Sequence, residues 1–550
     1  MEFNLLIGGE AGQGLMSIEN ELAETLSGLN CHFFATKNYM SRIRGGHNYH
    51  MFRIADCQVN ALSGAAWDMI IALNKETEDI HLSSLKKDGV LLSFEQLQEI
   101  EKHSREAYHS SRAANTILTG IILSVIGIPL EQIAIKEPGD EAPLKDGFLF
   151  AERWGIKARH AIVPKAAPDH VQFDGNQALA LGAILGGCQF MAGYPMTPAT
   201  SIMAYFSEAA LRLPILFEQA EDEISAINTA IGASYAGLRS MVATSGGGFA
   251  LMQEAVSLAG MTETPVVIIV GQRPGPSTGL PTRTEQADLN FVLHSGQGEF
   301  PRILLAPGSI DEAIDLAQKS FELADAFQIP VFILTDQYFA DSIHIAEDAI
   351  ATEVSHRDYK IYDSDYLRYR LTSTGVSPLT YPGLGEALVK IDSDEHDEEG
   401  KITEDLDLRV KMVNKRLAKW AGIKQSALAP NLFGDAESDT LLICWGSNKL
   451  IVKETVERLN KEGYRIAALH FRQVYPLTPE MIRDYNLPGK RLIGIENNAT
   501  GQFAGLLKRE LDIKVQERIL KYNGACFTVR EICEEVRRIA AFPLDGGRLG

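Results

Sequence analysis

The sequence GYPMTPATS at residues 193–201 begins the stretch that decides the fold, which continues as FEQAEDEISAINTAIGASYAG (217–237) and MVATSGGGF (241–249). Two prolines stiffen a turn in the first segment, which follows a short apolar run. Residues 213–217 predict a buried strand, and the isoleucines after them recur at helical spacing. The last segment begins as a strand and ends in glycines. This alternation of strand, turn and helix is typical of a parallel sheet covered by helices.

Three acidic residues, Glu221, Asp222 and Glu223, lie where the helical pattern begins. Carboxylates at a helix start interact favourably with the helix dipole, so capping and solubility are their ordinary roles. Gly232 follows Glu223 by nine residues, on a helix that we expect to pack very closely at that glycine. These residues alone leave two interpretations of Glu223 open, a structural carboxyl and a functional one.

Residues 175–341 predict one doubly wound α/β domain. Strands are predicted at 241–244, 265–270, 303–305 and 331–334, with helical patterns between them, notably at 310–326. The segment GPSTG at 275–279 matches the G-x-S-x-G pattern of hydrolases, but prolines surround Ser277 and no helical pattern follows directly. We therefore expect a rigid loop. Arg283 on this loop is either an anion ligand or part of a surface salt bridge.

Residues 1–165 predict a first α/β domain. An apolar strand at 3–7 runs into GGEAGQGL and then into a helical pattern, so backbone N–H groups should form an anion site near Gly12 and Gly14. The glycines do not follow G-x-G-x-x-G, and no acidic residue ends the next strand, so NAD binding is not favoured. Arg42 in the following SRIRGGH segment either meets the same anion or lies in a solvated turn. Residues 157–174, rich in alanine and proline, predict a linker.

Residues 342–431 predict a polar connecting segment, and residues 438–550 predict a third α/β domain. The connecting segment contains DSDEHDEEG at 392–400, where acidic neighbours around one histidine favour a solvated loop over a metal site. We expect no metal ligands in this chain. Residues 409–420 predict a basic amphipathic helix. The third domain shows no convergent nucleophile and base, so we expect it to be a supporting domain.

The composition describes an ordinary globular protein. Of the 550 residues, 45% are hydrophobic and 23% are charged, and the net charge of −20 disfavours nucleic acid and anionic membranes as partners. The N-terminus lacks the basic region of a signal peptide, and the longest uncharged stretch (113–130) suits a buried helix rather than a membrane span. Six cysteines without a C-x-x-C pair indicate buried, reduced thiols and no iron–sulfur cluster. These features predict a cytoplasmic protein.

In their order along the chain, these motifs resemble the 2-oxoacid:ferredoxin oxidoreductases. The chain is similar to an alpha subunit with a gamma domain fused at its N-terminus, the type often assigned to 2-oxoglutarate. GGEAGQGL and RIRGGHNYHMFRI resemble the gamma domain. The segments that resemble the alpha subunit are NQALALGAILGG, YPMTPATS, EDEISAINTAIGASYAG, TSGGGFALM, GPSTGLPTRTEQADL, DEHDEEGKITED and ENNATGQFAG. The resemblance implies a pyrimidine-binding domain of thiamine-diphosphate (TPP) enzymes at 175–341 and a transketolase C-terminal-like domain at 438–550.

The resemblance also implies roles for three residues. Glu223 would be the carboxyl that shares a proton with the aminopyrimidine ring of TPP and so activates the cofactor. Thr197 would hydrogen-bond the carboxylate or carbonyl of the 2-oxoacid. Arg283 would pair with a substrate carboxylate in a charge-assisted contact.

The family places the rest of the cofactor site on a separate beta subunit. That partner would hold the TPP diphosphate, Mg2+ and a [4Fe-4S] cluster, so this chain would be active only in a hetero-oligomer of alpha and beta subunits, such as a heterodimer. Gly12, Gly14 and Arg42 would bind the phosphates of coenzyme A, the co-substrate. The implied reaction converts a 2-oxoacid, above all 2-oxoglutarate, to acyl-CoA and CO2 while ferredoxin is reduced.

Two alternative enzymes stay open. A member of the same family specific for pyruvate or branched-chain 2-oxoacids would use the same residues, because Arg283 can serve any 2-oxoacid carboxylate. A TPP-dependent transferase or lyase would lack the redox step; the absence of a diphosphate domain, together with the gamma-like unit, counts against it. A non-enzymatic scaffold with degenerate sites is disfavoured because Glu223, Thr197 and Arg283 occur together.

Overall fold

The computed structural model describes residues 2–40, 45–135, 139–156, 158, 162, 171–346 and 353–540. Its contacts divide the chain into two compact units, of which the first comprises Met1–Phe173, Asp341–Glu347 and Thr528–Glu534 and the second comprises the rest. Arg42 and most of the predicted linker lie outside the described residues. The four-part division expected from the sequence stays a prediction.

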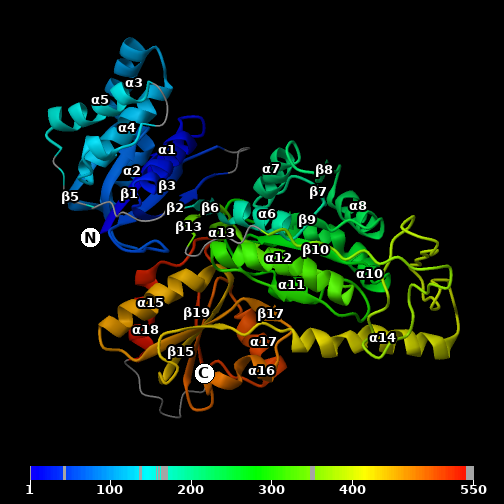
Figure 1. Ribbon diagram of the computed structural model, residues 1–550. Helices are drawn as coiled ribbons and strands as arrows, with labels where there is room; N and C mark the ends of the chain where they lie inside the picture. The colour runs from blue at the N-terminus through cyan, green and yellow to red at the C-terminus, as the bar shows by residue number, and fades with distance from the viewer. Residues whose placement is uncertain are drawn as a thin grey trace. The chain divides into compact units, whose positions relative to one another are not determined.

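A seven-stranded mixed sheet forms the first unit, in the order β5-β4-β1-β3-β2-β13-β6 (Figure 1). Its strands are β1 (Glu2–Gly9), β2 (His32–Asn38), β3 (Asn48–Ala55), β4 (Trp67–Ala72), β5 (Leu85–Leu92), β6 (Gln172–Asp174) and β13 (Ile343–Ile345). Its helices are α1 (Leu15–Gly28), α2 (Lys75–His81), α3 (Phe94–Tyr108), α4 (Arg112–Val125) and α5 (Glu141–Arg153). The uncharged stretch is confirmed as a buried helix, since α4 packs closely on α5: a Cβ at Gly120 would lie 2.3 Å from the carbonyl oxygen of Leu144.

A second seven-stranded sheet has the order β17-β11-β12-β10-β9-β7-β8 and is parallel apart from β17. Its strands are β7 (Phe190–Gly193), β8 (Leu216–Gln219), β9 (Ser240–Ser245), β10 (Val266–Gln272), β11 (Ile303–Leu305), β12 (Pro330–Asp336) and β17 (Gln473–Tyr475). The helices of this region are α6 (Gly175–Leu185), α7 (Thr200–Ala209), α8 (Glu223–Tyr235), α9 (Gly246–Phe249), α10 (Gln253–Met261), α11 (Leu289–Leu293), α12 (Ile310–Phe327) and α13 (Gln337–Asp341).

Helices cover both faces of this second sheet. Ile268 and Val270 of β10 belong to the core that includes residues of α8 and α10. Ile269, which alternates with them, is also fully buried and therefore lies on the opposite face. On that side α12 packs on β10 and on α6, where a Cβ at Gly182 would lie 2.5 Å from the carbonyl oxygen of Ile314 (Figure 1). The predicted doubly wound α/β arrangement is confirmed.

Two expectations for this region are wrong. The sequence predicts a buried strand at 213–217, but β8 begins at Leu216, which is 60% exposed because the strand ends the sheet and pairs along one side with β7. Gly232 was expected to pack closely, yet a Cβ there would meet nothing within 4 Å in the described chain. Gly232 lies on the outer face of α8, whereas Ile227 and Ile231 turn toward the core.

The third sheet has the order β14-β16-β15-β18-β19. Its strands are β14 (Asn431–Phe433), β15 (Thr440–Trp445), β16 (Ile466–Phe471), β18 (Arg491–Glu496) and β19 (Glu517–Leu520). The helices of this part of the sequence are α15 (Lys449–Lys461), α16 (Pro479–Ile482), α17 (Gln502–Leu511) and α18 (Val529–Ala540). Strand β17 leaves this region and pairs antiparallel with β11, so the second and third sheets are joined within the second unit.

Two general expectations can be compared with the structure. Four cysteines are buried as expected, but Cys57 is exposed and Cys526 is half-buried, so the expectation of buried thiols is wrong for these two. Across the described parts of the chain, no helix is both long and apolar enough to cross a membrane.

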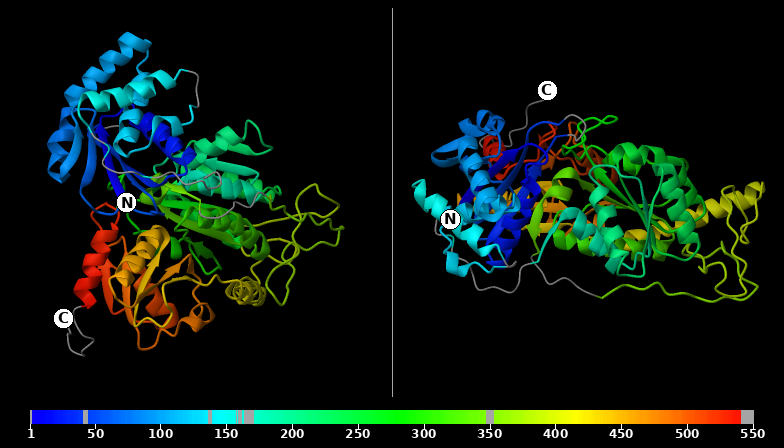
Figure 2. Two further views of the ribbon diagram at one scale, coloured as in Figure 1. Left: turned by 60° about the vertical axis from the view of Figure 1, so that its left-hand side comes forward. Right: turned by 90° about the horizontal axis from the view of Figure 1, so that it is seen from above.

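Residues 353–405 form loops with no helix or strand longer than a single bridge, and Figures 1 and 2 show them as the yellow-green chain that projects near α10 and α14 (Leu406–Gln425). The acidic cluster in these loops is not the solvated loop expected from the sequence. His396 is fully buried, with its ring centroid 3.8 Å from that of Tyr369. Glu395 accepts two hydrogen bonds from the Arg416 guanidinium of α14, at 3.0 and 2.9 Å. A buried aromatic contact and a paired arginine therefore fix the cluster.

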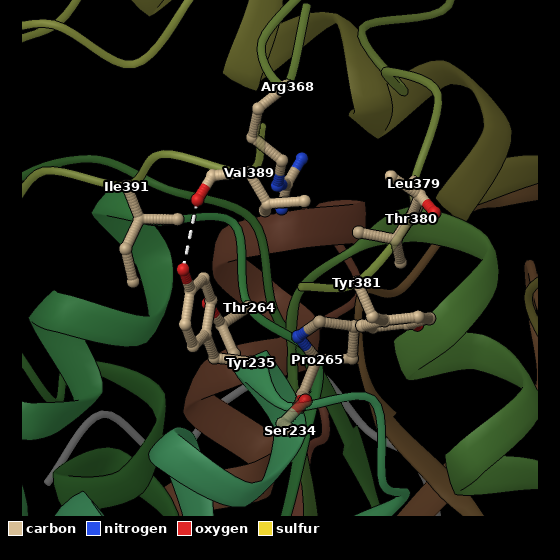
Figure 3. A pocket seen from close by; sticks show the side chains of 10 residues that line it. All are labelled: Ser234, Tyr235, Thr264, Pro265, Arg368, Leu379, Thr380, Tyr381, Val389 and Ile391. Atoms are coloured by element: carbon tan, nitrogen blue, oxygen red, sulfur yellow. Dashed lines mark hydrogen bonds between the residues drawn. The ribbon is translucent and has the colours of Figure 1, made fainter. Parts of the chain in front are cut away.

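A small cavity lies where these loops meet the end of α8. Figure 3 shows Tyr235 of α8 donating a hydrogen bond of 2.9 Å to the carbonyl oxygen of Val389, with Arg368 and Tyr381 nearby. The cavity volume is about 10 Å³. This is room for about one water molecule, so the cavity serves packing rather than ligand binding.

Buried ion pairs connect α14 to the segment between α10 and β10. The carboxylate of Glu263 contacts Lys415 Nζ at 2.6 Å and Lys419 Nζ at 2.5 Å, and all three side chains are about 1% exposed. Arg368 Nη2 donates to the Glu263 carbonyl oxygen at 2.7 Å. Burial by itself would raise the pKa of the Glu263 carboxyl, but the charges of Lys419 and Lys415 hold that pKa well below the usual range. The ionised carboxylate is thus required by two buried ammonium groups.

We expect Glu263→Gln to lower the free energy of unfolding by ~3–5 kcal/mol at pH 7, because two buried ammonium groups lose their counter-ion. A carboxyl with a lowered folded-state pKa stabilises the fold above its unfolded pKa and loses that contribution as the pH falls. The difference in the free energy of unfolding between the wild type and Glu263→Gln should therefore become smaller below about pH 4.5. Urea unfolding at several pH values measures it. Glu322→Gln, which breaks the exposed pair between Lys319 and Glu322, is the control and should cost less than ~1 kcal/mol; equal losses for the two variants would contradict the prediction.

Candidate active site

Three of the residues proposed from the sequence, Glu223, Thr197 and Arg283, lie in segments that follow strands of the second sheet. The turn at 194–198 follows β7, helix α8 follows β8, three glycines follow β9, and the loop at 273–288 follows β10. These strands are parallel and adjacent, so their carboxyl ends share one edge of the sheet. Ligands of open α/β sheets bind outside this edge.

Glu223 is the first residue of α8 and is only 3% exposed. The capping role belongs to its neighbour Asp222, whose side chain accepts a hydrogen bond of 2.7 Å from Ser225 N. Glu223 Oε1, Thr244 Oγ1 and Ser245 Oγ are buried and have no hydrogen-bond partner among the residues that the structure describes. Buried polar atoms normally have partners, so this group indicates a place where a ligand or water binds.

The glycines after β9 bring two carboxyl groups close to the backbone. A Cβ at Gly248 would lie 2.4 Å from Glu223 Oε1, and a Cβ at Gly246 would lie 2.2 Å from Asp288 Oδ2. Burial raises the pKa of Asp288 to about 6, although the nearby positive charge of Arg273 lowers it. Because glycine has no side chain, the three glycines Gly246–Gly248 at the start of α9, called the glycine turn below, can lie directly between the two carboxyl groups.

Thr197 is half-buried in the turn after β7, and the backbone around it is held at two points. Arg273 Nη1 donates to the Thr197 carbonyl oxygen at 2.9 Å. Asn176 Nδ2 donates to the carbonyl oxygen of Pro198 at 2.7 Å. These contacts fix the backbone of the turn on both sides of the Thr197 side chain.

Arg283 is half-buried on the loop after β10, and its neighbour Thr284 anchors that part of the loop. Thr284 N donates to the Gly524 carbonyl oxygen at 3.1 Å, and Thr284 Oγ1 donates to Asp336 Oδ1 at 3.1 Å. Burial raises the pKa of Asp336, whereas hydrogen bonds from Ser447 and Thr284 lower it. The loop after β19 and the end of β12 thus position the segment that carries Arg283.

Successive contacts link two of the predicted residues, Thr197 and Glu223. Thr197 is held by Arg273, Arg273 interacts electrostatically with Asp288, and Asp288 lies against the glycine turn that contacts Glu223. Arg283 lies on the same loop as Asp288, five residues earlier. Neither Arg273 nor Asp288 was predicted to be a site residue. Arg273 directly follows the end of β10, which is the signal that could have identified it. Asp288 comes 16 residues after Gln272, and only the fold brings its backbone N–H to the Gln272 side chain.

The glycine loop of the first unit borders a second cavity, of about 410 Å³. Gly12 and Gly14 have φ values of 94° and 84°, which favour glycine, and Gly14 precedes the first residue of α1. The cavity lining includes Gly12, Gly14, Ser17, Arg105, Arg112 and Asn115. Arg42 lies outside the described residues, so its predicted contact with this site stays a prediction. Glu101 also lines the cavity and accepts a hydrogen bond of 2.9 Å from Arg105 Nη2. The cavity is of the size of ligand sites and lies at the N-terminus of α1, where backbone N–H groups favour an anion.

Comparison with family models gives two matches. Residues 181–415 match the model described as pyruvate flavodoxin/ferredoxin oxidoreductase, thiamine diphosphate-binding, and residues 4–139 match pyruvate ferredoxin/flavodoxin oxidoreductase. Glu223, Thr197 and Arg283 lie within the first matched range, and Gly12 and Gly14 within the second.

Curated proteins and solved structures agree with these matches. The chain is 30% identical to the 2-oxoacid:ferredoxin oxidoreductase subunit alpha of Saccharolobus solfataricus over 98% of both chains. It is 33% identical to the 2-oxoglutarate synthase subunit KorA of Methanocaldococcus jannaschii over 59% of this chain and 87% of that protein. The structure of 2-oxoglutarate:ferredoxin oxidoreductase from Magnetococcus marinus, solved with 2-oxoglutarate, coenzyme A and succinyl-CoA bound, has a TM-score of 0.87 at 27% identity and covers 98% of this chain and 99% of that one.

The fold and the similarities define a subunit of an oxidoreductase. The chain belongs to the 2-oxoacid:ferredoxin oxidoreductase family and aligns with its alpha subunits over nearly its whole length. The family predicted from the sequence motifs is confirmed.

Proposed function

We propose that this chain is the subunit that activates TPP and binds the 2-oxoacid in a 2-oxoglutarate:ferredoxin oxidoreductase. The reaction would convert 2-oxoglutarate and coenzyme A to succinyl-CoA and CO2, with ferredoxin as electron acceptor. The observation that carries the proposal is the buried carboxyl of Glu223, whose Oε1 lacks a hydrogen-bond partner among the described residues at the edge where the predicted site residues gather.

The residues present fit the pyrimidine half of TPP. An aminopyrimidine ring needs an acidic partner for one ring nitrogen, and Glu223 Oε1 is available for it. Thr244 Oγ1 and Ser245 Oγ are further buried polar atoms that can bond the ring substituents.

TPP, when bound, supplies the nucleophilic carbon that makes decarboxylation of a 2-oxoacid possible. Glu223 would share a proton with the ring and so help to generate that carbon. Thr197 would donate a hydrogen bond to the 2-oxoacid, and Arg283 would pair with a carboxylate of the substrate. The contribution of this chain is therefore one proton relay and the orientation of the substrate.

The choice of 2-oxoglutarate is supported by the relative named 2-oxoglutarate synthase subunit KorA and by the Magnetococcus marinus structure, which contains 2-oxoglutarate. Coenzyme A is also bound in that structure, and we place its phosphates here at the cavity beside Gly12 and Gly14, with Arg42 as a further ligand. We assign the TPP diphosphate, Mg2+ and a [4Fe-4S] cluster to a beta subunit, because the alpha-subunit name implies a partner. The resulting alpha–beta complex would work in the cytoplasm.

Turnover of 2-oxoglutarate, pyruvate and branched-chain 2-oxoacids by the co-purified alpha–beta pair tests the proposal. We expect kcat/KM for 2-oxoglutarate to exceed that for the other substrates by at least ~10-fold, the effect of about one good polar contact. A preference for pyruvate would overturn the substrate assignment and leave the reaction class intact. Decarboxylation without reduction of ferredoxin would instead favour the non-redox transferase or lyase.

A further inference from the structure

The last residues of β10 and the arginine that follows it contact the turn that carries Thr197. A Cβ at Gly271 would lie 2.7 Å from Pro198 Cγ, so the proline ring rests directly on the backbone of the strand. Gln272 Oε1 accepts a hydrogen bond of 3.0 Å from Asp288 N. Arg273 then extends to the turn itself, which makes the end of β10 a common support for the turn and for Asp288.

Arg273 has the contacts of a side chain that holds backbone rather than one exposed to solvent. It is 9% exposed, and its Nη1 donates to the Thr197 carbonyl oxygen at 2.9 Å. Its Nη2 lies 3.6 Å from Met196 Sδ. One rigid guanidinium therefore contacts two successive residues of the turn, which a more flexible ammonium group would hold less firmly.

We propose that Arg273 is a positioning residue for the 2-oxoacid, which fixes the Thr197 turn so that its hydroxyl meets the substrate. The inference rests on the proposed function, in which Thr197 binds the 2-oxoacid. Arg273 acts through Thr197, so removing Arg273 should weaken substrate binding only as long as Thr197 is present. The binding of TPP, which depends on Glu223 and the glycine turn, should not change.

A double-mutant cycle in the co-purified alpha–beta complex tests this inference. The variants are Arg273→Met, Thr197→Ala and the double variant, and the readouts are KM and kcat for the 2-oxoacid, the dissociation constant of TPP, and the thermal unfolding temperature. We expect Arg273→Met to raise KM by ~10-fold or more with an unchanged TPP dissociation constant. In the Thr197→Ala background the same change should raise KM by less than ~2-fold.

Arg273→Lys keeps the charge and a hydrogen-bond donor group but loses the planar guanidinium, so it should give a KM between those of the wild type and Arg273→Met. If Arg273→Met does not fold, Arg273→Lys takes its place, and its effect on KM is compared with Thr197 present and in the Thr197→Ala variant. Arg212→Met, which removes an exposed arginine of the same unit, is the control and should leave KM unchanged. Equal KM effects of Arg273 substitution with and without Thr197, or an effect confined to TPP binding, would overturn the inference. If the activity of the complex still depends on Glu223, the proposed function stands although the inference about Arg273 fails. Failure of the inference can therefore be distinguished from failure of the proposed function.

Discussion

Glu223→Gln is expected to reduce turnover of the alpha–beta complex by ~10²–10⁴-fold, the usual contribution of a positioned acid–base group. The amide is nearly the same size as the carboxyl, so the packing against Gly248 is kept. It cannot share a proton with the aminopyrimidine ring, which is the step that we assign to Glu223. Steady-state reduction of ferredoxin at saturating 2-oxoacid and TPP measures the loss in kcat.

Glu221→Gln is the matched control. Glu221 is exposed and lies two residues before Glu223, so it carries the same charge near the same helix start without lining the site. We expect this variant to retain nearly full activity. Full activity of Glu223→Gln would mean that the buried carboxyl is structural, and the assignment of the cofactor site would be wrong.

Gly248→Ala is expected to have the second largest effect. The added Cβ would lie 2.2 Å from Thr244 Oγ1 and 2.4 Å from Glu223 Oε1, far inside van der Waals contact, so both polar groups must move. A displacement of about 1 Å in a catalytic group can cost ~10²-fold in rate. We expect a loss of that order in kcat/KM and a TPP dissociation constant raised by ~10-fold or more, measured by reconstitution with the cofactor.

Gly247→Ala separates this contact from a general effect of alanine in the glycine turn. A Cβ at Gly247 would meet only the Ser277 carbonyl oxygen, at an ordinary 3.7 Å, so the fold and the Glu223 carboxyl should be undisturbed. We expect an unchanged unfolding temperature and a much smaller loss of activity than for Gly248→Ala. Similar losses for both alanine variants would contradict the proposed role of the Gly248 contact.

Periodic patterns made much of the fold predictable from the sequence. The apolar run at 265–270 and the amphipathic pattern at 310–326 correspond to β10 and α12, because burial on a sheet and on a helix face imposes those periods. The edge position of β8 was not predictable, since an apolar run of five residues does not reveal whether a neighbouring strand covers it. The burial of His396 was also missed, because its partner Tyr369 lies 27 residues away in a region without regular structure.

The site was predictable to the extent that residues share a local motif. Glu223, Thr197 and Arg283 each belong to a distinctive segment, and the structure places all three beyond strand ends of one sheet, although their roles stay predictions. Arg273 and Asp288 were missed because their importance depends on contacts with Thr197 and Gly246, which come from other strands. Contacts of that kind are set by the order of strands in the sheet, which the sequence pattern does not state.

The exchange of the C2 proton of bound TPP with deuterium tests the central claim most directly. It can be followed by rapid acid quench and proton NMR in the alpha–beta complex without 2-oxoacid, so it reports on cofactor activation alone. We predict fast exchange in the wild type and in Glu221→Gln, and exchange in Glu223→Gln slowed to nearly the rate of free TPP while the cofactor stays bound. Equal exchange rates in the wild type and Glu223→Gln, with TPP bound in both, would contradict the role of Glu223.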